Sequence, residues 1–373
     1  MMFVPVNEPL LRGNERKYLN ECVDSGWIGS EGPFVQQFEQ QMAVICGRTH
    51  GIAVSNGSVA LDTAIQALNL PRGSEIILPS FTIISCAGAV VRCGHTPVVV
   101  DSDALTWNMD TTKIEERITP KTKAILMVHI YGIPTDIDAV LAIAQKYNLY
   151  VIEDAAEQIG QRYKGRVLGS FGDLSTLSFY PNKHITTGEG GMVLTNSDHL
   201  AARAKAIRNL SFVPEKRFVH YELSNNYRMS NLQAAVGVAQ LEQLAGFVDI
   251  KRRVGRLYNE LLKDLIGKYI AVQPALTDCA ENIYWVYGVV LMPDVAFEAD
   301  EAMKKLAALG VACRPFFYPM HQQPVFIEMG LFAGEKLLVA ENLAARGFYL
   351  PSGMALTETQ IRYVAKCLHE IFV

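Results

Sequence analysis

One lysine stands out because of the residues around it. Lys183 lies in a polar, glycine-rich segment, Ser178–Gly191, that follows a predicted strand. The carboxylate of Asp154 precedes it, at the end of another apolar strand. A lysine amine that forms a Schiff base, together with an aspartate that contacts a pyridinium nitrogen, is the pair that a pyridoxal cofactor uses. The alternatives are an exposed loop position for Lys183 and a helix N-cap for Asp154.

A second segment, Ser55-Asn56-Gly57-Ser58, follows a predicted strand and precedes a predicted helix, Val59–Leu68. Free backbone N–H groups and a hydroxyl group at a helix N-terminus bind anions such as phosphate. The same residue types also suit an ordinary turn and N-cap. Taken alone, the segment leaves both interpretations open.

The elements that must position these residues alternate between strands and helices. Several strands are apolar on both faces, as in Ala124–Val128, which indicates a sheet covered on both sides. Helices such as Val59–Leu68 and Asp136–Tyr147 lie between the strands. This alternation predicts an α/β domain with a mostly parallel sheet. The predicted strands are Gly51–Val54, Ser74–Pro79, Pro97–Asp101, Lys123–Ile130, Tyr150–Glu153, Leu174–Phe179 and Gly191–Thr195.

The remainder of the chain predicts a smaller α+β domain. Helical spacing extends from Asn231 to about Lys268, which is longer than an average globular helix, so we expect a break near Gly246. The chain also exceeds the roughly 250–300 residues at which single cores stop growing. We therefore predict a large domain over residues 1–245 and a small C-terminal domain over residues 246–373. The other predicted elements are a strand at Tyr284–Leu291, a helix at Ala299–Leu309, and a C-terminal helix from Thr357.

Composition argues against several classes of protein. The 373 residues are 50% hydrophobic and 19% charged, with a formal net charge of −4. Such a chain can bury a large core and carries no charge signature for nucleic acid. No run approaches the roughly 18 apolar residues of a membrane span, and no signal-peptide pattern begins the chain. The 7 cysteines and 8 histidines are scattered. We expect a cytoplasmic protein that binds no metal, nucleic acid or membrane.

Together, and in this order, the segments resemble the DegT/DnrJ/EryC1/StrS group of pyridoxal-phosphate-dependent nucleotide-sugar aminotransferases. The resemblance extends over nearly the whole chain, and the segment around Lys183 is highly specific for this group. The matching segments are Gly13-Asn14-Glu15, Ser25-Gly26-Trp27-Ile28, Ser55-Asn56-Gly57-Ser58, Val128-His129-Ile130-Tyr131-Gly132, Glu153-Asp154-Ala155-Ala156-Glu157, Asn182-Lys183, Thr186-Thr187-Gly188-Glu189-Gly190-Gly191 and Asn226-Tyr227-Arg228-Met229-Ser230-Asn231.

This resemblance implies the fold of aspartate aminotransferase (fold type I) and a homodimer with shared active sites. It implies that pyridoxal 5'-phosphate is the cofactor, that Lys183 binds it covalently, and that Asp154 contacts its pyridine nitrogen. A lysine that also shuttles a proton must be neutral part of the time, so we expect burial to lower its pKa. The other implied cofactor contacts are Gly57, Ser58 and Ser178 at the phosphate, Glu157 and Ile83 at the ring, and Asn226 from the neighbouring subunit.

The implied reaction transfers an amino group from glutamate to a nucleotide-linked 4-keto-6-deoxy sugar. The segments Gly13–Leu19 and Arg314–His321 resemble those of group members that act on GDP-4-keto-6-deoxymannose, and this resemblance implies the same substrate, in the biosynthesis of O-antigen or a related polysaccharide. For each candidate substrate contact the alternative is a solvated surface or core position. These candidates are Trp27, Arg314, Tyr318 and His321, with Lys216, Arg217 and His220 as further basic side chains.

Two features bear on the type of reaction. Ile83 stands where the family usually has an aromatic residue, so it loses the stacking geometry but can still cover the ring. In a dehydratase branch of the same fold, histidine replaces the Schiff-base lysine. Here Lys183 is retained and His184 follows it, in a segment that we expect to be extended, so that it points elsewhere. Transamination is favoured over dehydration. A dTDP- or UDP-linked keto sugar as the substrate, and a regulator that binds the cofactor, also stay open.

Overall fold

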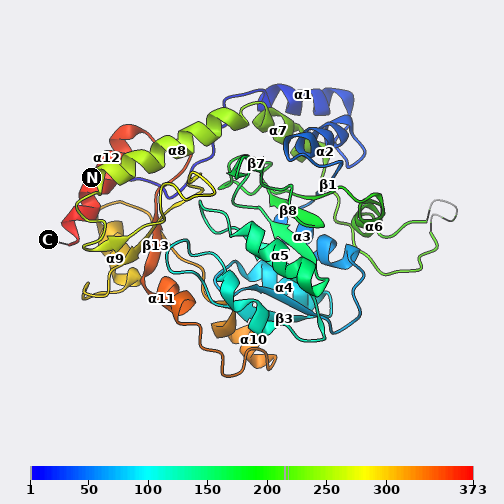
Figure 1. Ribbon diagram of the computed structural model, residues 1–373. Helices are drawn as coiled ribbons and strands as arrows, with labels where there is room; N and C mark the ends of the chain where they lie inside the picture. Colours follow the sequence, from blue (N-terminus) through cyan, green and yellow to red (C-terminus); the bar gives the residue numbers. More distant parts are fainter. Residues whose placement is uncertain (1, 214–215, 217, 373) are drawn as a thin grey trace.

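The computed structural model describes residues 2–213, 216 and 218–372 and contains a large central sheet (Figure 1). The sheet has seven strands in the order β1-β9-β8-β5-β4-β2-β3. Neighbouring strands are parallel except at β9, which is antiparallel to both β8 and β1. The predicted strands and the mostly parallel sheet are confirmed. The strands are β1 (His50–Val54), β2 (Glu75–Pro79), β3 (Thr96–Val100), β4 (Thr122–Val128), β5 (Tyr150–Asp154), β8 (Leu174–Ser178) and β9 (Gly191–Thr195).

Helices cover both faces of this sheet because successive side chains of each strand enter different cores. In β4, Ile125 and Met127 pack in the core under α2 (Pro33–Ile45), α5 (Ile137–Tyr147) and α7 (Asn231–Leu241). Leu126 and Val128 pack in the opposite core. The helices over that second face are α3 (Gly57–Ala67), α4 (Ile84–Arg92) and α6 (Asp198–Arg208). This two-sided burial explains why the strand is apolar throughout.

A smaller antiparallel sheet, in the order β10-β11-β13-β12, has its own core. The first residues of the chain join this part, since Val4 pairs with Val311. The predicted division at residue 245 stays a prediction. The strands and helices here are β10 (Ile270–Ala271), β11 (Tyr287–Leu291), β12 (Arg314–Pro315), β13 (Gly347–Leu350), α8 (Leu244–Leu261), α9 (Ala299–Ala308) and α12 (Glu358–Glu370).

The remaining elements are short or peripheral. Among the described residues, no helix combines the length and the apolar character that crossing a membrane requires. The elements are α1 (Glu15–Ser25), η1 (Thr111–Lys113), η2 (Glu115–Arg117), β6 (Arg162–Tyr163), β7 (Arg166–Val167), η3 (Met320–Gln322), α10 (Pro324–Glu328) and α11 (Leu338–Arg346).

The long helical stretch is broken as predicted, but the break lies before Gly246 rather than at it. Helix α7 ends at Leu241 and α8 begins at Leu244, so Gly246 lies inside α8. Glycine loses more backbone entropy in a helix than other residues, at a cost of about 1 kcal/mol in a helix interior, but Gly246 lies in the first turn of α8 rather than in its interior. No neighbouring atom lies within 4 Å of where a Cβ of Gly246 would stand.

The end of β5 is fixed by a buried carboxylate. Glu153 is fully buried, and burial alone raises the pKa of its carboxyl group. Hydrogen bonds from His129 and from two backbone N–H groups outweigh that effect and hold the pKa below its ordinary value. The donors to Glu153 are His129 Nε2 (3.2 Å), Ser175 Oγ (2.9 Å) and the N–H groups of Gly169 (2.7 Å) and Phe171 (2.8 Å).

Replacing Glu153 by glutamine should lower the free energy of unfolding by about 3–5 kcal/mol, because donors arranged around a charge lose it inside the core. The carboxylate stabilises the fold above its unfolded pKa of about 4.3, and this contribution disappears as pH falls through the lower folded pKa. Chemical denaturation should therefore separate wild type from Glu153→Gln at pH 7 and bring them together in acid. Glu115→Gln, at an exposed ion pair with Lys146, serves as the control and should change little; equal stability of Glu153→Gln and wild type at pH 7 would contradict the assignment.

Candidate functional site

A cavity of about 530 Å³ opens where the carboxyl ends of β4, β5 and β8 meet the N-terminus of α3. Open α/β sheets bind ligands at this edge. Its wall is completed by Trp285, Phe317 and Tyr349, which come from around the second sheet. The predicted cofactor contacts that line this cavity are Gly57, Ser58, Ile83, Asp154, Glu157, Ser178 and Lys183.

Asp154 is the last residue of β5, and strand alternation turns it away from the core that Glu153 enters. Its Oδ1 accepts a hydrogen bond from the N–H of Ala156 (3.1 Å), and its Oδ2 lies 3.5 Å from Cys86 Sγ. Burial raises the pKa of Asp154, while the Ala156 N–H group and the charge of Lys183 act in the opposite direction. No helix follows Asp154 directly, so the N-cap alternative is wrong.

Lys183 is half-buried and follows a tight turn. The N–H of Lys183 donates to the carbonyl oxygen of Tyr180 (2.9 Å) across Pro181 and Asn182, and proline at the second position favours such a turn. Burial lowers the pKa of Lys183, as the sequence predicts, while the carboxylates of Glu157 and Asp154 oppose this shift. Burial therefore makes the neutral form of this amine more accessible than in an exposed lysine.

The expectation that His184 lies in an extended segment is wrong, because the turn at Pro181 continues into it. The segment is a series of bends rather than an extended strand, because the proline restricts the backbone. His184 is nevertheless 1% exposed and lies outside the cavity, so the expectation that it points away from the site is confirmed. Burial lowers the pKa of His184 well below its ordinary value.

The N-terminus of α3 is built to approach a ligand closely. Asn56 Oδ1 caps the helix by accepting from the N–H of Val59 (3.0 Å), so the predicted N-cap and the predicted anion site coincide. A Cβ at Gly57 would lie 2.8 Å from Ser178 Cβ, too close for any larger residue. Ser58 Oγ, hydrogen-bonded to Ser85 Oγ (2.7 Å), adds a hydroxyl group. These donors fit a phosphate group, and together with Lys183 and Asp154 they fit pyridoxal phosphate.

Glu157 and Ile83 lie on the cavity wall in different ways. Burial raises the pKa of Glu157 to about 7, opposed by the charge of Lys183. Glu157 Oε2 accepts from the N–H of Tyr131 (2.7 Å), a residue with the left-handed φ of 61°. Strained backbone of this kind is concentrated at functional sites. Ile83 is 42% exposed and presents an aliphatic surface to the cavity. The roles of both residues toward the cofactor stay predictions.

The structure does not bring all predicted substrate contacts to the cavity. His321 is buried, with Nδ1 2.8 Å from Ser80 Oγ and Nε2 3.0 Å from Glu341 Oε1, so both ring nitrogens are used inside the fold. Its prediction as a substrate contact is corrected on that ground. Trp27 and Tyr318 are exposed but do not line the cavity. Arg314 lines a neighbouring hollow of about 280 Å³ that shares Trp285 and other wall residues with it.

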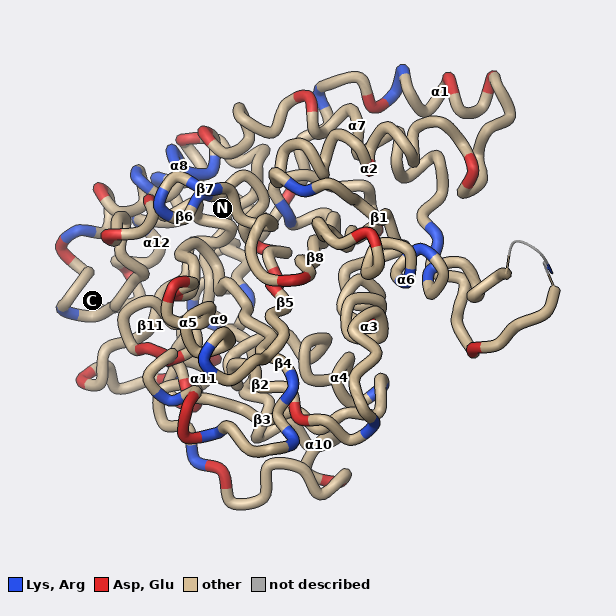
Figure 2. The backbone as a smooth tube through the Cα atoms, turned by 45° about the vertical axis from the view of Figure 1, so that its right-hand side comes forward, with Lys and Arg blue, Asp and Glu red and all other residues tan. Residues whose placement is uncertain are grey.

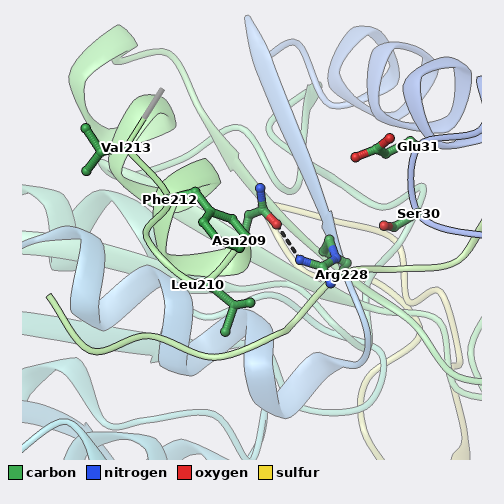
Figure 3. A pocket seen from close by; sticks show the side chains of 7 residues that line it. All are labelled: Ser30, Glu31, Asn209, Leu210, Phe212, Val213 and Arg228. Carbon is green, nitrogen blue, oxygen red and sulfur yellow. Dashed lines mark hydrogen bonds between the residues drawn. The ribbon is translucent and has the colours of Figure 1, made fainter. Parts of the chain in front are cut away.

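The predicted subunit contact, Asn226, lies on a different part of the chain. It pairs with Asn209 and accepts from the N–H of Arg228 (3.3 Å), outside the cavity of its own subunit. The segment between α6 and α7 that contains it stands out from the body (Figures 1 and 2). At its base Arg228 donates a hydrogen bond to Asn209 Oδ1, and both residues line a second cavity of about 580 Å³ together with Ser30 and Glu31 (Figure 3).

Among the basic side chains of this projecting segment, Arg217 lies outside the described residues. Lys216 and His220 do not line the main cavity, and His220 Nδ1 lies 2.8 Å from the carbonyl oxygen of Leu210. Their role as substrate contacts stays a prediction. Over the described ranges, no group of three or more His, Cys, Asp or Glu side chains is placed to hold a metal ion.

Sequence reasoning missed the far wall of the cavity. Trp285, Phe317 and Tyr349 follow Lys183 by more than one hundred residues, and no local pattern connects them to it. The strand predicted at Tyr284–Leu291 begins only at Tyr287, which leaves Trp285 in an irregular segment before β11. The one available signal was the rarity of tryptophan, of which the chain has 3.

Comparisons with known proteins agree with this geometry. The family model of the DegT/DnrJ/EryC1/StrS aminotransferases matches residues 9–369. A GDP-perosamine synthase of Caulobacter vibrioides is 42% identical over 99% of this chain and 98% of its own length. A second, from Escherichia coli O157:H7, is 40% identical over 100% and 99%. The solved aminotransferase from Psychrobacter cryohalolentis superimposes with a TM-score of 0.92 at 29% identity, over 100% and 99% of the two chains. The predicted fold type is confirmed.

Filling the space beside Gly57 tests the phosphate site. Gly57→Ala should weaken the binding of pyridoxal phosphate roughly tenfold or more, because the added methyl group collides with Ser178 and displaces the helix N-terminus. Titration of the full-length protein with pyridoxal phosphate, followed by absorbance, measures this change. Gly246→Ala makes the same chemical change in open space and should leave the affinity unaltered. Equal affinities of the two variants would place the phosphate elsewhere.

Proposed function

The chain belongs to the DegT/DnrJ/EryC1/StrS aminotransferase family, and we propose that it transfers the amino group of glutamate to GDP-4-keto-6-deoxymannose, giving GDP-perosamine. As a member it is a pyridoxal-phosphate-dependent sugar aminotransferase. The observation that carries the mechanism is the meeting of Lys183, Asp154 and the N-terminus of α3 in one cavity. The identity of the sugar rests on the full-length similarity to GDP-perosamine synthases. We also keep the cytoplasm as the expected location.

Bound pyridoxal phosphate supplies an electron sink for the bond that breaks at the amino-bearing carbon. Around it, each residue has a distinct task. The first N–H groups of α3 and the hydroxyl groups of Ser58 and Ser178 bind the phosphate. The Asp154 carboxylate holds a proton on the pyridine nitrogen, since a buried anion favours the neighbouring cation. Lys183 would hold the cofactor covalently through Nζ, and this amine would be free to move protons once the amino donor is bound.

Once released, Lys183 is the base of the reaction. Its Nζ takes a proton from the carbon that carries the amino group of glutamate and returns a proton on the cofactor side. This requires the neutral amine, which burial favours by lowering the pKa of Lys183. In the second half of the reaction the same Nζ delivers the proton to the sugar carbon that gains nitrogen. A single amine thus serves as both base and acid.

Two alternatives are disfavoured by specific observations. A dehydratase of this fold uses histidine in place of the lysine, but here Lys183 lines the cavity and His184 is buried outside it. A regulator that binds the cofactor without turnover would have no need for Asp154 and Lys183 in one cavity. The geometry therefore favours transamination.

A homodimer with shared active sites is part of the proposal. The projecting segment between α6 and α7 exposes apolar side chains, Val219, Tyr221 and Leu223, that a monomer would leave in water. Asn226 lies on the same segment, outside its own cavity, where it can complete the phosphate site of a partner. A surface of this kind is expected for a two-fold contact that exchanges segments.

Lys183→Ala should abolish transamination and the absorbance of the cofactor bonded to the protein, because Lys183 is the one lysine among the described residues that line the cavity. The assay supplies glutamate with GDP-, dTDP- and UDP-linked 4-keto sugars and identifies products by mass spectrometry. Lys146→Ala, at an exposed surface position, should retain wild-type rates. A product that has lost water without gaining nitrogen would show that the protein is a dehydratase. Amination of a dTDP- or UDP-linked sugar in place of the GDP-linked one would overturn the proposed substrate. Cofactor binding without any turnover would support the regulator instead.

Mixing two inactive variants tests the shared site. Lys183→Ala and Asn226→Ala should each be inactive or strongly impaired as homodimers. When they are mixed after reversible dissociation, each heterodimer contains one site with both residues intact, so activity should rise to about a quarter of the wild-type value. Full activity of Asn226→Ala alone would remove the residue from the site, and failure of the mixture to recover would place each site within one subunit.

A further inference from the structure

The indole of Trp285 contacts both the amine of Lys183 and the main chain of the residue before it. Lys183 Nζ lies 3.8 Å from the centre of the indole ring, within the range of a cation–π contact. The indole N–H donates to the carbonyl oxygen of Asn182 (2.7 Å), the residue directly before Lys183. Trp285 is 4% exposed, so its position is set by the fold rather than by solvent. One side chain therefore braces the turn that carries the lysine and supports its amine.

Trp285 is in turn held by Lys251, from helix α8. Lys251 Nζ donates to the carbonyl oxygens of Trp285 (2.7 Å) and Ser352 (2.5 Å). Ser352 Oγ accepts from the N–H of Tyr287 (2.8 Å), at the start of β11. The amine of Lys251 thus joins Trp285, two residues before β11, to Ser352, two residues after β13.

Lys251 is an unusual residue to bury. It is 1% exposed, and its hydrogen-bond partners among the described residues are these two carbonyl oxygens rather than a carboxylate. Burial, and then the charge of Lys183, lower its pKa to about 7. An apolar side chain of similar length would avoid the cost of desolvating an amine. The choice of lysine therefore calls for a benefit other than stability.

We propose that Trp285 and Lys251 are positioning residues for Lys183, holding its amine against the indole face whenever it is not bonded to the cofactor. This role rests on the proposed function of Lys183. A free lysine side chain has many rotamers, and a reacting amine must return to one place between the two proton transfers. The indole restricts that amine through its face, and the Asn182 bond fixes the turn below it. Lys251 contributes by fixing the main chain of Trp285.

The first test measures attachment of the cofactor to the protein rather than turnover. Full-length protein freed of cofactor with hydroxylamine is mixed with pyridoxal phosphate, and the bond to Lys183 is followed by absorbance and by borohydride fixation with mass spectrometry. Trp285→Leu should slow attachment roughly tenfold or more, because the amine loses its support. Trp285→Phe keeps an aromatic face and should lie between this variant and wild type. Trp107→Leu removes an equally buried indole outside the cavity and should attach cofactor at nearly the wild-type rate.

The second test separates positioning from stability at Lys251. Lys251→Met leaves the carbonyl oxygens of Trp285 and Ser352 without their donor, so it should lower the denaturation midpoint while still folding. It should also slow attachment in the same direction as Trp285→Leu. It should also lower kcat and leave KM for glutamate nearly unchanged, because the ground-state contacts to the donor remain. If Lys251 had a merely structural role, Lys251→Met would show the same loss of stability but keep the wild-type rates of attachment and turnover.

The outcomes distinguish the positioning role from the proposed function. If wild-type protein forms no bond with the cofactor at Lys183, the proposed function fails. If wild type, Trp285→Phe and Lys251→Met all attach cofactor at the same rate with the same kcat, the function stands and the positioning role is overturned. That conclusion does not depend on Trp285→Leu, so a failure of that variant to fold leaves the positioning role fully testable.

Discussion

The site depends on the alternation of two neighbouring carboxylates at the end of β5. Glu153 enters the core, where four donors fix it, and Asp154, one residue later, enters the cavity. A shift of one residue in the register of this strand would exchange the two side chains and destroy both environments. The buried anchor therefore determines where the cavity carboxylate stands, and the rest of the cavity is arranged around that position.

Much of the near side of the site could be predicted because it is local in the sequence. Gly57 lies in a strand–helix turn, Asp154 ends an apolar strand, and Lys183 follows another, so each pattern contains its own evidence. The resemblance to a family then assigned their roles together. Trp285 and Lys251 could not be found in this way, because their contacts join segments that are distant in the chain. Their importance is visible only in the packing of the two sheets.

The departures from prediction also have physical causes. Histidine is a residue type that can bind a diphosphate. The two ring nitrogens of His321, however, are hydrogen-bonded to Ser80 and Glu341 inside the fold. Glycine is unfavourable in the interior of a helix, which is why the sequence predicts a break near Gly246. The residue lies instead in the first turn of α8, where glycine lowers helix stability less. The net charge of −4 suggested nothing about anionic ligands. Charged residues of both signs are interspersed over the chain (Figure 2), so an anion site in this chain depends on local donors such as the N–H groups at the N-terminus of α3.

The cavity wall has a consequence for the synthesis of the protein. Lys183 comes near the middle of the chain, whereas Trp285 and Tyr349, which enclose it, come late. During synthesis, the residues around Lys183 leave the ribosome long before the residues that form the far wall of the cavity. The cavity therefore encloses Lys183 only after Tyr349 has been added to the chain. Ligand binding in this cavity therefore depends on segments from both halves of the chain.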